Sequence, residues 1–274
     1  MAQKIQLHRF LDVGKPALHI ASRDFISCRD SESIKNAIDI MLRGHGRIPV
    51  VDRKGEFAGM ITSTGILDYL GAHSRHEIFM GMKSPLHAPV GKVMDTYVQA
   101  LKSKANIKVA LGAFRKHGND AFPIIRGKKL VGVVSKWDIV QQLNSPLGLK
   151  VKDAMMPKPM IVSEGWSVFD VAKMMVRGGY RRFPVVKEGI LMGMVTPHEI
   201  LYHLRRSESL HRLKKEETEI RHVMQKRVAA LVPEQDLGEA IEMMGKSRTT
   251  ALPVAEEGEF LGLLTESDVI DFLE

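Results

Sequence analysis

Residues 262–268, near the C-terminal end of the chain, read GLLTESD. The stretch is an apolar strand pattern that ends at Thr265 and continues into a helix pattern with Asp268 in its first turn. Related stretches precede it: GMITSTG at 59–65, GVVSKWD at 132–138 and GMVTPHE at 193–199. One strand-to-helix junction therefore occurs four times, and only the first copy lacks an acid at its last position.

A second repeated pattern lies ahead of each junction. An apolar residue and a proline stand there, and the prolines Pro49, Pro123, Pro184 and Pro253 are 74, 61 and 69 residues apart. Before each proline, apolar residues follow the i, i+3, i+4, i+7 spacing of one helix face. These residues are Ile34, Ala37, Ile38 and Met41; Ile107, Ala110, Leu111 and Phe114; Val168, Val171, Ala172 and Met175; and Leu237, Ala240, Ile241 and Met244.

The chain between proline and junction predicts a β-hairpin. Two short apolar runs are joined by a charged turn that contains glycine, as at 187–189 and 256–259. With a short extended segment before each helix, the unit is β-α-β-β-α. A unit of about 50 residues cannot close a core alone, so we expect the units to pair into two pseudo-two-fold modules. The sequence thus predicts an α/β (α+β) fold with an N-terminal arm at 1–22 and repeats at 23–72, 93–144, 151–206 and 219–274.

Composition and charge limit the classes of function. The 274 residues are 44% hydrophobic and 26% charged, which is typical of a soluble globular protein. The single cysteine, Cys28, excludes an internal disulfide and favours a cytoplasmic setting. No apolar run approaches the roughly 20 residues of a membrane span, so we expect no membrane partner. The net charge of +8 favours anionic partners, although an ordinary solvated basic surface would explain the charge equally well.

These motifs, repeated four times, resemble the CBS (cystathionine-β-synthase) domain. The features that carry the resemblance are the apolar-Pro-Val-Val strand, the glycine turn and the Gly-apolar-apolar-Thr/Ser-x-x-Asp junction, over roughly residues 23–274. A chain of four such domains also resembles the gamma subunit of AMP-activated protein kinase. The resemblance implies ligand clefts between paired repeats.

The junction suits a nucleotide chemically. A Thr or Ser at the strand end can cap the helix, whose N-terminus attracts phosphate, and an Asp one turn later can accept hydrogen bonds from a ribose diol. We therefore predict ligand contacts from Thr265 and Asp268 and from Ser135 and Asp138. The alternative is the capping box, a purely structural device, which prefers Glu or Gln.

The other two copies depart from that pattern. The capping box fits Thr196 and Glu199 of the third copy best, although both stay candidates for ligand contact. In the first copy Gly65 replaces the acid, so a ribose contact is not expected there, whereas Thr62 and Thr64 can still contact phosphate.

Basic residues just ahead of the prolines are candidates for phosphate contact. Arg47, Arg181 and Arg182 stand where the gamma-subunit resemblance implies phosphate-binding groups, and a guanidinium pairs bidentately with phosphate oxygens. Ordinary solvated arginine is the alternative reading. Arg248, His117 and Lys136 are weaker candidates.

The sequence favours a non-enzymatic regulatory function. We find no nucleophile–base pair and no metal-ligand spacing, so we expect neither catalytic residues nor a metal. The prediction is an energy-sensing protein that binds AMP, ADP or ATP and signals to a protein partner. S-adenosylmethionine is an alternative ligand. Nucleic-acid binding is an alternative function, based on the net charge of +8 and the basic runs at 205–206, 214–215 and 226–227.

Overall fold

The computed structural model describes residues 4–44, 46–72, 85–143, 146–206 and 217–274. Each repeat has a helix, a hairpin and a second helix in that order. In the first repeat these are α1 (Ile34–Met41), β2 (Arg47–Val51), β3 (Phe57–Thr62) and α2 (Ser63–Leu67). In the second they are α3 (Ile107–His117), β5 (Ala121–Arg126), β6 (Lys129–Ser135) and α4 (Lys136–Val140).

The second half of the chain repeats the same order. The third repeat has α6 (Val168–Gly178), β7 (Phe183–Lys187), β8 (Ile190–Val195) and α7 (Pro197–Arg206). The fourth has α8 (Leu237–Lys246), β9 (Ala251–Glu256), β10 (Glu259–Thr265) and α9 (Glu266–Phe272). The remaining short elements are β1 (Cys28–Arg29), β4 (Leu101–Lys102), α5 (Val151–Ala154), η1 (Leu7–Arg9), η2 (Ala17–His19), η3 (Asp68–Ala72), η5 (Pro85–His87), η6 (Val90–Lys92) and η9 (Ile220–His222).

The predicted hairpins form with a β-bulge in each. Every hairpin pairs antiparallel, and the register shifts at matching positions, between Val50 and Val51 in the first repeat and between Val185 and Val186 in the third. We call the extended chain before the first helix of each repeat its lead-in segment. This segment runs parallel to the first hairpin strand, as β1 on β2 and β4 on β5. In the third and fourth repeats single parallel bridges replace that strand. The third and fourth hairpins join into one sheet of order β7-β8-β10-β9.

Paired repeats exchange their lead-in segments. Asp95, near the start of the second repeat, pairs with Met60 of the first hairpin, and Ser22, at the end of the N-terminal arm, pairs in return with Val133 of the second hairpin. Gln225 and Met156 make the same exchange between the third and fourth repeats. The exchange ties repeats one and two, and repeats three and four, into the two predicted pseudo-two-fold modules.

The junction glycine makes room for this exchange. A Cβ built on Gly59 would lie 2.4 Å from the carbonyl oxygen of Asp95, and one on Gly193 would lie 2.4 Å from that of Gln225. A Cβ is essentially never found so close to a non-bonded atom, so any larger residue would push the lead-in segment away from the hairpin. Close backbone approach therefore requires the first residue of three repeated stretches, Gly59, Gly193 and Gly262, to be glycine, whereas a Cβ on Gly132 would meet the Leu18 side chain.

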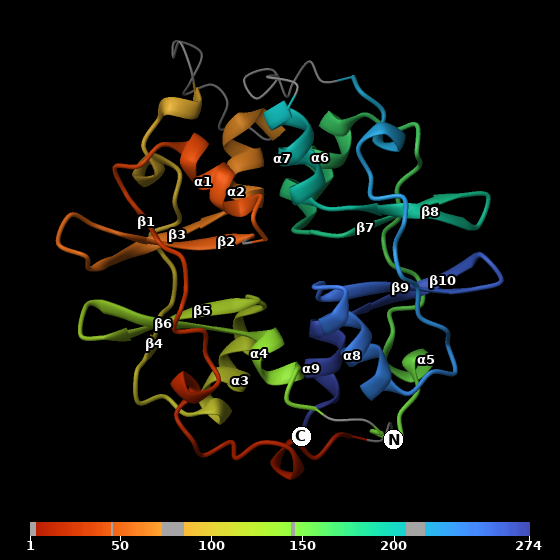
Figure 1. Ribbon diagram of the computed structural model, residues 1–274, viewed down its shortest axis with the longest axis horizontal. Helices are drawn as coiled ribbons and strands as arrows, with labels where there is room; N and C mark the ends of the chain where they lie inside the picture. Colours follow the sequence, from red (N-terminus) through yellow and green to blue (C-terminus); the bar gives the residue numbers. More distant parts are fainter. Residues whose placement is uncertain (1–3, 45, 73–84, 144–145, 207–216) are drawn as a thin grey trace.

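Two hydrophobic cores join repeats from different modules. One core holds α1 and α2 with α6 and α7, and the other holds α3 and α4 with α8 and α9. All sixteen apolar helix positions predicted from the spacing are buried. Figure 1 shows these helix layers on the outside and the hairpins between them, with the four repeats around a common centre. Helix packing thus joins repeats one to three and two to four, across the module boundary.

The N-terminal segment packs on the second core. Ile5 and Leu7 are buried, and the Ile5 amide donates to the Phe272 carbonyl at 2.8 Å. Residues 5–7 consequently lie beside the last residues of the chain, and the Glu274 amide donates in return to the Ile5 carbonyl at 2.8 Å. Across the described ranges, no helix combines the length and apolarity that a membrane crossing requires.

Candidate functional site

The hydroxyl of every junction caps a helix. Thr62 accepts a hydrogen bond from the Gly65 amide at 3.0 Å, and Ser135 and Thr265 accept from Asp138 and Asp268 at 3.2 and 3.4 Å. Thr196 accepts from the His198 amide at 3.1 Å. Each hydroxyl stands where a strand ends and the next helix begins, so its position follows from the hairpin register.

Two of the junction acids, Asp138 and Asp268, complete capping boxes, whereas at Glu199 the Thr196 hydroxyl accepts from the His198 amide instead. One carboxylate oxygen of Asp138, Glu199 or Asp268 accepts from the backbone amide of its own cap residue at 2.6, 2.8 and 2.8 Å. The same oxygen accepts the cap hydroxyl in each case. The complete capping boxes thus occur at the two aspartates, the reverse of the expectation that the box fits Thr196 and Glu199 best. The ribose-binding roles given to Asp138 and Asp268 stay predictions.

The environments of these acids nevertheless differ. Burial raises the pKa values of Asp138 and Asp268, although their capping hydrogen bonds work against it. Burial also acts to raise the pKa of Glu199, but hydrogen bonds from His198 and Thr196 outweigh it and hold that pKa below its ordinary value. Glu199 is thus the junction acid whose charge is most favoured by its surroundings.

A first cavity of about 470 Å³ lies beside the junction of the first repeat. Its walls come from that junction, from the lead-in segment of the second repeat and from the end of α6. Apolar side chains line one part of it: Met60, Val93, Met94, Met175 and Val176. Polar groups line the rest: Thr62, Thr64, Asp68, Asp95 and Arg181. Tyr97 also lines it, with 97% of its surface exposed.

A second cavity of about 680 Å³ lies beside the junction of the third repeat. It uses the elements that correspond by pseudo-symmetry: the lead-in segment of the fourth repeat and the end of α1. Thr196, His198, Glu199 and Gln225 line this part, with Met194 and Val228 as apolar wall. The cavity continues to the centre of the molecule, where Arg47, Arg181 and Arg182 line it. Both cavities share Thr62, Thr64 and Arg181.

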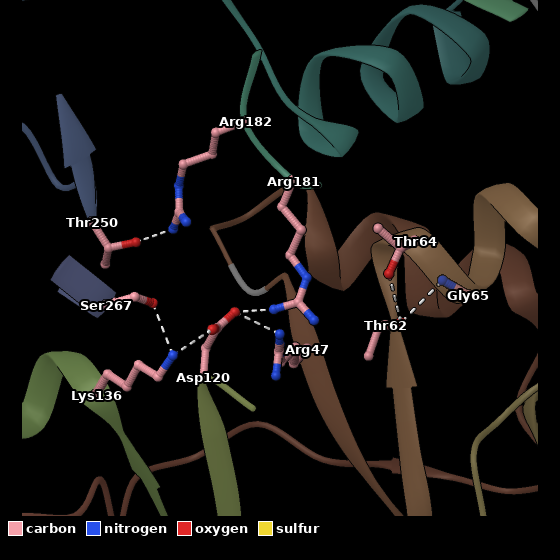
Figure 2. A network of polar contacts seen from close by, with 10 residues as sticks. All are labelled: Arg47, Thr62, Thr64, Gly65, Asp120, Lys136, Arg181, Arg182, Thr250 and Ser267. Atoms are coloured by element: carbon pink, nitrogen blue, oxygen red, sulfur yellow. Dashed lines mark hydrogen bonds and ion pairs between the residues drawn. The ribbon is translucent and has the colours of Figure 1, made fainter. Parts of the chain in front are cut away.

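The centre holds a polar network contributed by all four repeats (Figure 2). Asp120 accepts from Arg47 at 2.6 Å, from Arg181, and from Lys136 at 3.4 Å. Lys136 also donates to Ser267 at 2.8 Å, and Arg182 donates to Thr250. The predicted arginines of the first and third repeats, which lie far apart in sequence, are therefore brought to one place.

Cations from three repeats meet carboxylates at this centre. Arg47, Lys136, Arg181 and Arg182 lie near Asp120 and Glu266, and the charges of Asp268 and Asp271 also act on Arg182 and Lys136. Burial lowers the pKa of Arg47 to about 10 and lowers the pKa values of Lys136 and Arg182 in the same direction. Burial raises the pKa of Glu266, which the neighbouring cations oppose. Burial thus disfavours the charged forms here, and an anionic ligand would offset that cost for the cations.

Several members of the network were not among the predicted site residues. Asp120 and Thr250 stand three residues before their prolines, the offset that Arg181 has in the third repeat. Glu266 directly follows its junction hydroxyl, as Lys136 does, and both are buried. The repeat alignment therefore contained a signal for these positions. Of the weaker candidates, Lys136 belongs to the network and Arg248 lines the second cavity.

Other chemistry finds less support in the residues that the structure describes. These residues contain no group of His, Cys, Asp and Glu arranged for a metal ion. Cys28 is buried, and burial raises the pKa of its thiol to about 12. Of the basic runs, Arg205 pairs with Asp39 at 3.0 Å and Arg206 lies over the Tyr202 ring, whereas 214–215 falls outside the described residues.

Comparisons with known proteins agree with the repeat structure. The CBS domain model matches residues 17–72, 90–145, 151–206 and 220–274. Protein MJ1225 of Methanocaldococcus jannaschii is 25% identical over 268 residues, which is 92% of this chain and 96% of that protein. A 33.4 kDa protein from the ribosomal RNA operon of Thermofilum pendens is 26% identical over 258 residues, 87% of this chain and 85% of that one.

Comparison of the fold with solved structures finds the same relative, MJ1225. The crystal structure of MJ1225, described as a candidate archaeal homologue of γ-AMPK, superposes with a TM-score of 0.85 at 24% identity, over 94% of this chain and 99% of that one. A protein from Pyrococcus horikoshii superposes with a TM-score of 0.61 at 19% identity, over 94% of this chain and 100% of that one. With four family matches that cover most of its length, the chain belongs to the CBS domain family.

Proposed function

We propose that the chain is a non-enzymatic sensor of adenine nucleotides, AMP, ADP or ATP. The nucleotide lies in the clefts beside the first and third junctions, with its phosphates directed at the central cations. A protein partner reads the resulting change in the packing of the repeats. Such a signal requires the nucleotide to bind one arrangement of the repeats more tightly than the other.

The observation that carries this proposal is the way in which both cavities converge on Arg181. Each cavity has an apolar part that suits a flat base and a polar part that ends at the shared Thr62, Thr64 and Arg181. Volumes of about 470 and 680 Å³ lie in the range of small-molecule sites. The central cations lie where a phosphate chain would end.

Carboxylates beside each cavity suit a ribose. In the second cavity Glu199 is available in its charged form, because hydrogen bonds hold its pKa low. In the first cavity Asp68 and Asp95 line the wall near the position where Gly65 replaces the junction acid. Asp68 follows Gly65 by three residues, about one helical turn, so it can supply the missing acceptor from the same side of the chain.

Family likeness supports a ligand of this kind. MJ1225, a relative of similar length and fold, has been described as a candidate homologue of γ-AMPK, a subunit of an AMP-activated kinase. S-adenosylmethionine shares the adenosine but carries no phosphate, and its sulfonium and ammonium groups outweigh its single carboxylate, so it would bring no net negative charge to the central cations. The central arginines therefore favour a nucleotide over S-adenosylmethionine.

Calorimetric titration of the full chain with AMP, ADP, ATP, adenosine and S-adenosylmethionine, at one ionic strength, tests the proposal. We expect at least one nucleotide to bind more tightly than adenosine, because only a nucleotide brings phosphate to the centre. Binding of none of the three nucleotides would overturn the proposal. Binding of S-adenosylmethionine alone would replace it with the S-adenosyl alternative.

A further inference from the structure

Asp120 holds cations from three different repeats. Its carboxylate contacts Arg47 of the first repeat at 2.6 Å, Arg181 of the third repeat, and Lys136 of its own repeat at 3.4 Å. The side chain of Asp120 is 22% exposed, so these contacts are made largely out of water. Figure 2 shows both arginines directed at this carboxylate. Two of the three contacts join separate repeats.

The residue differs from its equivalents in the other repeats. Three residues before the proline, the first repeat has Gly46, the third Arg181 and the fourth Thr250. Among these four positions, Asp120 is the one acid and Arg181 is the one base, and their side chains are in contact. The two are paired across the boundary between the modules.

A carboxylate and a phosphate compete for the same donors. Both accept two parallel hydrogen bonds from a guanidinium, and both bring negative charge to it. Arg47 and Arg181 line the second cavity, and Arg181 also lines the first. A phosphate that enters either cavity therefore meets an arginine that Asp120 already holds.

We propose that Asp120 is an internal competitor for the ligand's phosphate and sets the charge that a ligand must carry. This inference rests on the proposed function. A phosphate with two negative charges displaces the Asp120 carboxylate from Arg181. An uncharged nucleoside does not compete with Asp120 for Arg181. Displacement also releases the contacts of Asp120 to the first and third repeats. The exchange thus couples ligand binding to the packing of the modules.

Replacement of the carboxylate by an amide tests the inference. In Asp120→Asn the cations lose their internal partner, so we expect the Kd of AMP to fall by about 5- to 20-fold at constant ionic strength. We expect the same direction for inorganic tripolyphosphate, and no change for adenosine. Asp120→Thr, which introduces the residue type of the fourth repeat, is the second variant should the first fold poorly. Asp39→Asn, a carboxylate outside both cavities, is the control for net charge.

The probes separate this inference from the proposed function. Nucleotide binding that is unchanged or weaker in both Asp120 variants, with tripolyphosphate unchanged as well, overturns the role of Asp120. An equal gain for adenosine also overturns it, because the effect would then not concern phosphate. If the wild-type chain binds no nucleotide, the proposed function fails, and the tripolyphosphate titration still decides whether Asp120 competes for the central cations.

Discussion

At the scale of single residues, one carboxylate oxygen carries the whole capping function of each junction acid. In Asp268 the oxygen Oδ2 accepts both the Thr265 amide, at 2.8 Å, and the Thr265 hydroxyl, at 2.7 Å. The second oxygen is left to face other groups. Capping and ligand binding are therefore compatible uses of one side chain, and a variant that disturbs only one of them is needed to separate them.

The pair of His198 and Glu199 predicts a pH dependence of stability. His198 Nδ1 lies 3.4 Å from Glu199 Oε1. The hydrogen bond with Glu199 raises the pKa of His198, and the same contact helps to lower the pKa of Glu199 against the effect of burial. The His198 contribution is fully present below the unfolded pKa of histidine, about 6.5, and is lost as pH rises through the raised folded pKa. The Glu199 contribution is present above about pH 4.3 and is lost as pH falls through the lowered folded pKa.

The pair therefore stabilises the fold most between about pH 4.3 and 6.5. We expect His198→Gln to lower the free energy of unfolding more at pH 5.5 than at pH 8.5, by about 0.5 kcal/mol or less, because 46% of the His198 side chain is exposed. Urea denaturation at the two pH values measures the difference. In a Glu199→Gln background the pH-dependent part should shrink, because only the contact of His198 with the Leu42 carbonyl would remain, and an undiminished difference there would assign it to another group.

At the scale of elements, the exchange of lead-in segments is the feature that decides which repeats pair. The hairpins present a glycine at the point of contact, and the sulfur of Met94 or Met224 lies near it. Each cavity has one wall from such a segment, so the exchange also builds the site. A change at the glycine should consequently affect stability and ligand binding together.

Gly193→Ala tests this contact. The new Cβ would lie 2.4 Å from the Gln225 carbonyl oxygen, so we expect a loss of about 1–3 kcal/mol in the free energy of unfolding. Gly112→Ala is the matched control, because that glycine is exposed within α3 and has nothing within 4 Å of the added atom. The control should gain about 0.5–1 kcal/mol from helix propensity. Equal effects of the two substitutions in urea denaturation would refute the close approach.

The sequence was most informative about the helices and hairpins. The helix faces and the hairpins follow from local spacing, and the repetition of that spacing from 34 to 273 gave the pairing of units. The central network did not follow, because Asp120 and Arg181 are 61 positions apart and meet only through the packing of two modules. Capping by Asp138 could not be separated from ligand binding, because both uses need an acid at the same position.

At the scale of the whole molecule, two kinds of contact join the four repeats. Sheets and lead-in segments join the first repeat to the second and the third to the fourth, whereas helices join the first to the third and the second to the fourth. The four hairpins therefore bring their ends to one centre. The cations Arg47, Lys136, Arg181 and Arg182 meet there, and a phosphate placed among them would contact several repeats together.

Arg181 is the residue on which this account depends most, because it lines both cavities and pairs with Asp120. Arg177 is the matched control: it is an exposed arginine of α6, and it lines neither cavity. Loss of one charge-assisted contact to phosphate is expected to cost about 1.5–3 kcal/mol.

The most direct test is the calorimetric Kd of AMP for the wild-type chain, Arg181→Ala and Arg177→Ala, with adenosine titrated beside it. The account predicts that Arg181→Ala raises the Kd of AMP by about tenfold or more and leaves adenosine binding unchanged, whereas Arg177→Ala behaves as the wild type. AMP affinity that is equal in Arg181→Ala and the wild type would contradict it.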